Sequence, residues 1–119
     1  MNACVCVAAS PNVKQYKKAK NVIEDDPFQV ECIAWGTLPL KVTWLLRGVD
    51  IVADEHRVIY KNSSGGGRLL ENATLRIEEM QFADAGEYVC VVENEYGNAT
   101  ATITVHVKGK MSQRYVDTV

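Results

Sequence analysis

The chain has 119 residues, enough for one domain built around one hydrophobic core. Hydrophobic residues make up 47% of it and charged residues 24%, which argues against the disordered and fibrous classes. The formal net charge is -2 and no apolar run approaches the roughly 20 residues that span a bilayer, so nucleic acid and direct membrane insertion are not expected.

Residues 1–11 are expected to form an N-terminal extension, residues 12–108 the domain and residues 109–119 a C-terminal tail. Residues 3–9 are apolar and end in small side chains, as the tail of a secretory signal does, but no charged start precedes them. Cys4 and Cys6 lie two residues apart, a poor spacing for a mutual bridge. They are expected to be inert, although linking two chains or capping a neighbour stays open.

Four later runs alternate apolar and polar residues with the period of a β-strand, namely residues 28–34, 41–46, 73–77 and 99–107. Each run has one face suited to a core, and no stretch shows a sustained helical period. Turn-forming residues separate the runs, among them the glycine-rich segment 63–67, which lacks the lysine of a phosphate-binding loop. The pattern predicts an all-β domain.

Two cysteines and a tryptophan fall on inward positions of separate runs. Cys32 and Cys90 would form one bridge that packs against the indole of Trp44. Closing a loop of this length stabilises the fold by roughly 4 kcal/mol in the chain-entropy model. A zinc site is the competing interpretation, but only His56 and His106 could supplement the cysteines and no C-x-x-C motif occurs, so neither a metal nor another cofactor is expected.

The order Cys32, Trp44, Leu75 and then D-x-G-x-Y-x-C over residues 84–90 resembles the immunoglobulin superfamily. The resemblance implies a two-sheet Greek-key sandwich, with Tyr88 as the tyrosine at the corner leading into the second cysteine strand. The short segment between Trp44 and Leu75 resembles the I-set found in adhesion molecules and receptor ectodomains. By the same resemblance, Arg57 begins a strand and pairs with Asp84 as a structural salt bridge.

Intracellular proteins also carry such domains, so the compartment needs separate evidence. Three N-x-[ST] sequons begin at Asn62, Asn72 and Asn98, more than chance predicts for a chain this short. Together with a pairable cysteine couple they favour secretion, N-linked glycans and an extracellular location, either secreted or in the ectodomain of a membrane protein.

Catalysis is not expected, because a sandwich of this size fills its interior with side chains and no serine or cysteine stands in an activating context. Function is therefore sought on a surface. The runs containing Trp44, Cys90 and Val105, strands C, F and G of the resembled fold, would form one sheet. Its predicted partner-binding residues, called here the candidate binding face, are Thr43, Leu45, Val89, Val91 and Thr102.

This face departs from the usual polar exterior of a sheet, because Leu45, Val89 and Val91 form an apolar centre. A charged rim surrounds it, which is the layout of a protein interface. The rim residues are Lys41, Arg47, Glu87 and Glu93.

We therefore expect a recognition module for cell adhesion or receptor-type binding, with a second copy or a different protein as its partner. Two alternatives stay open for the face: the β-branched residues serve strand propensity alone, or a neighbouring domain covers them. A structural spacer domain, extracellular or in muscle, is the alternative function. A terminal valine at position 119 is also compatible with binding to a PDZ groove, although the end of an unstructured tail explains it equally.

Overall fold

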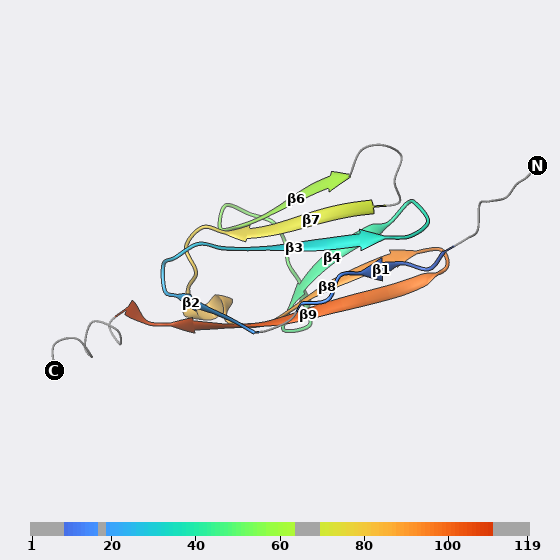
Figure 1. The fold of residues 1–119 in the computed structure, drawn as a ribbon. Helices are drawn as coiled ribbons and strands as arrows, with labels where there is room; N and C mark the ends of the chain where they lie inside the picture. Colours follow the sequence, from blue (N-terminus) through green and yellow to red (C-terminus); the bar gives the residue numbers. More distant parts are fainter. Residues whose placement is uncertain (1–8, 17–18, 64–69, 111–119) are drawn as a thin grey trace, which may run out of the picture.

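The computed structural model describes residues 9–16, 19–63 and 70–110 (Figure 1). Its strands form two sheets that pack face to face, and one short 3-10 helix, η1 (Phe82–Asp84), lies at one end of the sandwich. The all-β, two-sheet Greek-key sandwich that the resemblance implied is confirmed.

Within the described residues, the two sheets have four and five strands. In spatial order, the first consists of β1 (Asn12–Val13), β3 (Phe28–Trp35), β7 (Leu70–Ile77) and β6 (Arg57–Ser63). The second consists of β2 (Lys20–Ile23), β9 (Gly97–Lys108), β8 (Gly86–Asn94), β4 (Lys41–Leu46) and β5 (Val49–Asp50). All paired strands are antiparallel except β2 and β9.

The first part of the chain contributes to both sheets. Val13 of β1 pairs with Ala34 of β3, after which the chain crosses over and Lys20 of β2 pairs with Val105 of β9. β1 and β2 are therefore short edge strands, one in each sheet. Short edge strands limit edge-to-edge pairing with other chains. Residue alternation does not predict these strands, because two and four residues are too few to show a period.

Contacts with the domain begin upstream of β1. The Ala9 carbonyl oxygen accepts hydrogen bonds from the Thr37 amide at 3.2 Å and from Nδ2 of Asn94 at 2.8 Å. Pro11 is buried, and a Cβ on Gly36 would lie 2.9 Å from its Cα atom. With φ at +146°, position 36 therefore requires glycine on both steric and conformational grounds.

The core lies between the sheets and follows the alternation read from the sequence. In β3 every second residue from Phe28 to Ala34 is buried, and in β4 the buried positions are Val42, Trp44 and Leu46. The last strand is longer than the predicted run 99–107: β9 begins at residue 97 and ends at residue 108. The inward faces assigned from the sequence to residues 28–34, 41–46 and 73–77 are confirmed.

Cys32 and Cys90 form the expected disulfide between the sheets, with Cα atoms 6.3 Å apart. Trp44 pairs with Cys90 in the β4–β8 register and is only 1% exposed. Its indole Nε1 donates a hydrogen bond to the Ala73 carbonyl oxygen at 3.4 Å, so the one polar atom of the buried ring has a partner in the opposite sheet.

Replacing Trp44 with alanine is expected to lower the free energy of unfolding by about 3–5 kcal/mol, because a large cavity would open beside the disulfide. Trp35 is the matched control, since it is 42% exposed at the end of β3. Its replacement should cost less than about 1 kcal/mol. Urea denaturation followed by circular dichroism measures both, and equal losses would contradict this assignment of the core.

Candidate protein-binding surface

The candidate binding face lies on the outer side of the five-stranded sheet, where strand register arranges it in two rows. In one row Thr43 of β4 lies beside Val91 of β8, and in the next Leu45 lies beside Val89. Val89 in turn pairs with Thr102 of β9. The register thus brings together all five residues predicted from the sequence on one surface, across three adjacent strands.

The centre of this surface is apolar and partly accessible to solvent. Leu45, Val89 and Val91 are half-buried, whereas Thr102 on β9 is exposed. A shallow groove of about 250 Å³ runs along the β4 side, lined by Lys41, Thr43, Leu45, Asp50, Val91 and Glu93. A partner side chain entering this groove would contact apolar groups of Leu45 and Val91 among charged and polar neighbours. Such a mixture is typical of the boundary between the core and the rim of an interface.

The charged rim occupies both ends of the same surface. Lys41 pairs with Glu93 at one end, and at the other the Arg47 amide donates to the Glu87 carbonyl oxygen at 3.0 Å. Each end therefore carries one cation and one anion. All four residues are exposed, as a rim position requires.

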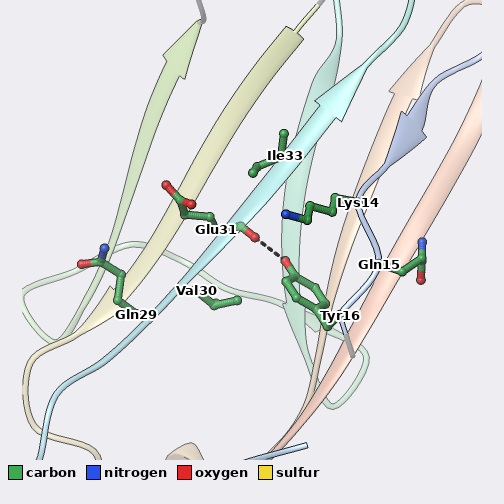
Figure 2. A pocket seen from close by; sticks show the side chains of 7 residues that line it. All are labelled: Lys14, Gln15, Tyr16, Gln29, Val30, Glu31 and Ile33. Carbon is green, nitrogen blue, oxygen red and sulfur yellow. Dashed lines mark hydrogen bonds between the residues drawn. The ribbon is translucent and has the colours of Figure 1, made fainter. Parts of the chain in front are cut away.

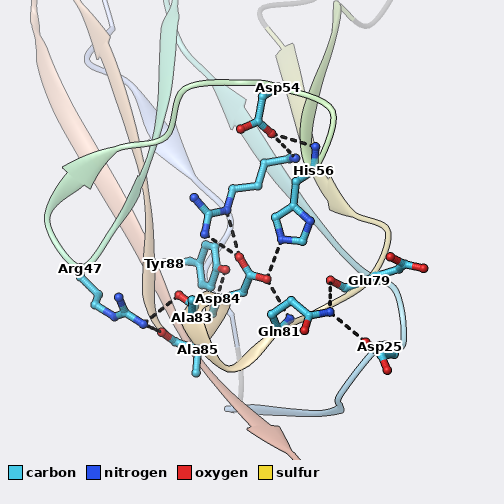
Figure 3. Close-up of polar contacts among 11 residues, drawn as sticks. Asp25, Arg47, Asp54, His56, Glu79, Gln81, Ala83, Asp84, Ala85 and Tyr88 are labelled. Carbon is cyan, nitrogen blue, oxygen red and sulfur yellow. Dashed lines mark hydrogen bonds and ion pairs between the residues drawn. The ribbon is translucent and has the colours of Figure 1, made fainter.

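Arg47 is held in place more firmly than a typical rim cation. One guanidinium nitrogen, Nη2, donates hydrogen bonds to the carbonyl oxygens of Ala83 at 2.9 Å and Ala85 at 2.7 Å (Figure 3). Its backbone has φ at +53°, a left-handed conformation that turns the chain between β4 and β5. Alternation alone did not indicate this contact, because it depends on the turn conformation.

A buried carboxylate closes one end of the sandwich (Figure 3). Asp84 is 1% exposed, and its Oδ1 accepts hydrogen bonds from Nε of Arg57 at 3.1 Å and from Nη2 at 2.5 Å. Its Oδ2 accepts from the Gln81 amide at 2.8 Å and from Nε2 of His56 at 2.7 Å. Four donors therefore satisfy the two oxygens, which is what makes burial of this charge tolerable.

Arg57 opens β6 and Asp84 ends η1, so their salt bridge connects two segments that are distant in sequence. The Tyr88 hydroxyl donates to the main-chain oxygen of Asp84 at 2.5 Å, as the resemblance implied for a tyrosine corner. His56 was not predicted to take part. Its position in an irregular segment gave no periodic signal, and the sequence alone does not bring it to Asp84.

The hydrogen bonds set the ionisation of this cluster. Burial by itself would raise the pKa of Asp84, but donors from the Gln81 backbone, Arg57 and His56 outweigh it and hold the pKa below the ordinary value of 3.8. Burial and the nearby Asp84 charge raise the pKa of Tyr88 well above its usual range. Tyr88 is therefore a neutral hydrogen-bond donor at physiological pH.

A second groove lies beside β3, where the chain leaves the four-stranded sheet (Figure 2). It measures about 370 Å³ and is lined by Lys14, Gln15, Tyr16, Gln29, Val30, Glu31 and Ile33. The Tyr16 hydroxyl donates to the Glu31 carbonyl oxygen at 2.6 Å, and burial raises the pKa of this phenol. Tyr16 thus satisfies a backbone acceptor on β3 at the point where β1 no longer pairs with it.

The three sequons are divided between the two sheets. Asn62 of β6 and Asn72 of β7 are register partners in the four-stranded sheet, and their side chains lie outside the described part of the structure. Asn98 is exposed near the start of β9 in the five-stranded sheet. Cys4, Cys6 and residue 119 lie outside the described residues.

Other kinds of site are not found in the described part of the chain. Across residues 9–16, 19–63 and 70–110, no helix has the length and apolar character needed to cross a membrane. Within the same ranges, histidine, cysteine and acidic side chains nowhere gather in the groups of three that could hold a metal ion.

Comparisons with known proteins place this arrangement among related domains. The family model described as Immunoglobulin I-set domain matches residues 11–107. A human relative, Leucine-rich repeat and immunoglobulin-like domain-containing nogo receptor-interacting protein 2, is 32% identical over 108 residues, which cover 89% of this chain and 16% of the relative. Mouse Hemicentin-2 is 36% identical over 93 residues, which cover 78% of this chain and 2% of the relative.

Among solved structures, a complex of a titin immunoglobulin domain with an obscurin-like 1 immunoglobulin domain aligns with a TM-score of 0.70 and 24% identity. The alignment covers 85% of this chain and 96% of that chain. This likeness shows the fold. The chain corresponds to a small part of the curated relatives and to nearly the whole of a single solved domain.

The lowered pKa of Asp84 predicts an acid-sensitive fold. A carboxylate with a depressed folded-state pKa stabilises the native state above its unfolded pKa, and this contribution is lost as pH falls through the lower folded value. The Asp84→Asn variant should lose about 2–3 kcal/mol near neutral pH, because Arg57 and His56 lose a charged acceptor. Below about pH 4 its stability should approach that of the unmodified chain.

Thermal unfolding across pH 2 to 7 measures this effect. Asp50→Asn provides the control, because Asp50 is exposed in β5. This variant should retain the loss of stability at acidic pH. An unchanged acid slope in Asp84→Asn would show that this carboxylate does not govern the transition.

Proposed function

The chain belongs to the immunoglobulin I-set family, and from this premise we propose that it is an extracellular recognition module that binds another protein through the candidate binding face. Domains of this family are in general binding modules that mediate protein–protein interactions. One observation carries the proposal: the sheet exterior is apolar at Leu45, Val89 and Val91, where a solvated sheet would be polar.

The layout of this surface supports an interface. Its apolar residues are contiguous across β4 and β8, a groove crosses them, and exposed charges bound the patch at both ends. Burial of an apolar centre gives affinity, while a charged rim of mixed sign gives orientation and limits incorrect partners. The partner is either a second copy of this chain or a different protein with a matching apolar centre.

An extracellular location is part of the proposal. The disulfide is compatible with an oxidising compartment, and the three sequons are acceptors for N-linked glycans only in the secretory pathway. Adhesion or receptor-type binding is the role that combines a glycosylated surface with one apolar face.

A structural spacer is the second candidate, and a different observation favours it. Large exposed apolar side chains also lie at the ends of the sandwich, with Trp35, Leu38 and Tyr96 at one end and Val49 and Phe82 toward the other. Neighbouring domains in a linear array would bury such residues. In that case the candidate binding face would have no partner, and substitutions on it would leave assembly unchanged.

Replacing Leu45 and Val89 with aspartate should abolish association while leaving the fold intact, because two charges would enter the apolar centre. Light scattering across a concentration series measures the molar mass of the chain secreted from eukaryotic cells. Ile33→Asp provides a matched control, since Ile33 is a half-buried apolar residue on the outer side of the other sheet. It should associate as the unmodified chain does.

Reducing and non-reducing conditions separate the mechanisms of dimer formation. A reversible dimer insensitive to reductant supports the proposed face, and a reductant-sensitive dimer implicates Cys4 and Cys6. A strict monomer contradicts homophilic binding and directs the search to a different protein partner. Unfolding of Leu45→Asp or Val89→Asp, seen by circular dichroism, would contradict their assignment to the outer surface.

A further inference from the structure

We propose that an N-linked glycan on Asn98 restricts the candidate binding face and thereby weakens association. This inference rests on the proposed function, since it concerns the same surface. The register of β9 carries it: of the three sequons, the one at Asn98 lies in the sheet that contains the face.

Asn98 points to the same side of the sheet as the face. Along β9, Asn98, Thr100 and Thr102 are exposed while Ala101 is 1% exposed, so the even-numbered residues of this stretch face outward. Thr102 is itself a residue of the candidate binding face. A glycan on Asn98 therefore projects from the outer side of the sheet and not from its core side.

The distance between the glycan site and the apolar centre is short. Asn98 pairs with Glu93 of β8, and the next outward pair along these strands is Thr100 with Val91. Two residues along a strand span about 7 Å and adjacent strands are separated by about 5 Å, so Val91 is the first apolar residue that the glycan reaches. Leu45 lies one row further away and one strand further across.

The local chemistry allows the modification. Asn98 and Thr100 are both exposed residues, and the preceding Gly97, the first residue of β9, has φ at +155°. A glycan in this position needs no rearrangement of the core. The alanine between them, Ala99, is half-buried and anchors the strand on its inner side.

A glycan is bulky and hydrophilic, so it opposes the desolvation on which an apolar interface depends. Near Asn98 it keeps the Val91 end of the face hydrated and leaves the Leu45 and Val89 row accessible. Glycans on Asn62 and Asn72 would leave the candidate binding face bare, because β6 and β7 belong to the other sheet. These two sequons are therefore natural controls.

Two measurements test the proposal on the full chain secreted from glycosylating cells. Mass spectrometry first determines the occupancy of each sequon. Hydroxyl-radical footprinting then compares side-chain labelling in the glycosylated chain without substitutions and in the Asn98→Gln variant, which lacks the glycan at this position. The variant should show increased labelling of Val91 and a smaller increase at Leu45, because the bulky glycan no longer shields the surface, while Asn62→Gln and Asn72→Gln should show neither change.

Association is measured in parallel by light scattering, with the chain itself as the probe. Asn98→Gln should dimerise at least about tenfold more tightly than the glycosylated chain without substitutions. The control variants Asn62→Gln and Asn72→Gln should show no such gain. Thr100→Ser retains the sequon and its glycan, so this variant should associate as the chain without substitutions does. Adding Leu45→Asp to Asn98→Gln should remove the gain, which shows that the gain arises from the face.

The outcomes distinguish the two proposals. An unoccupied Asn98, or equal labelling of Val91 with and without its glycan, overturns the inference about the glycan whatever the association data show. Protection of Val91 without any dimer in Asn98→Gln supports the covering of the face but contradicts homophilic binding. Association that depends on Leu45 but not on Asn98 supports the proposed function and overturns the inference.

Discussion

The covalent link between Cys32 and Cys90 is the constraint on which the rest of the structure depends. It joins one strand of each sheet through their inward faces. Because side chains along a strand alternate between two faces, fixing one inward position in β3 and one in β8 fixes the direction of every other side chain in both strands. Strand register then carries this parity to β4 and β9, which have no cysteine of their own.

The outward surface follows from the same constraint. With Cys90 inward, Val89 and Val91 must point outward, and the register places Leu45 and Thr102 beside Val89. A shift of one residue would have exposed Trp44 and buried Leu45 in its place. The apolar centre of the candidate binding face is thus a consequence of where the disulfide lies, and the Asp84 cluster then fixes the end of the sandwich at which β6 and β8 begin.

Most of the fold could be predicted because four runs of residues carry a period of two, and because Asp84, Tyr88 and Cys90 form a specific motif. What could not be predicted depends on short or irregular segments. β1 and β5 have two residues each, and His56 and Arg47 reach their partners only through turns. These contacts join residues that are 28 and 36 positions apart, and local alternation contains no information about them.

The candidate binding face is not uniform across the sheet, and this asymmetry bears on how a partner would approach. All three of its apolar residues, Leu45, Val89 and Val91, lie on β4 and β8, whereas the outward residues of β9 in this region are the polar Asn98, Thr100, Thr102 and Thr104. Apolar burial is therefore most favourable along the row of Leu45 and Val89, on the side of the face away from β9. Hydroxyl groups on β9 retain water more readily, so a glycan at the start of that strand lies on the side where the loss of contact costs least. A partner that approaches from the β5 side gains the apolar row of Leu45 and Val89 first and meets the Asn98 glycan last, which is why the glycan is expected to weaken association rather than abolish it.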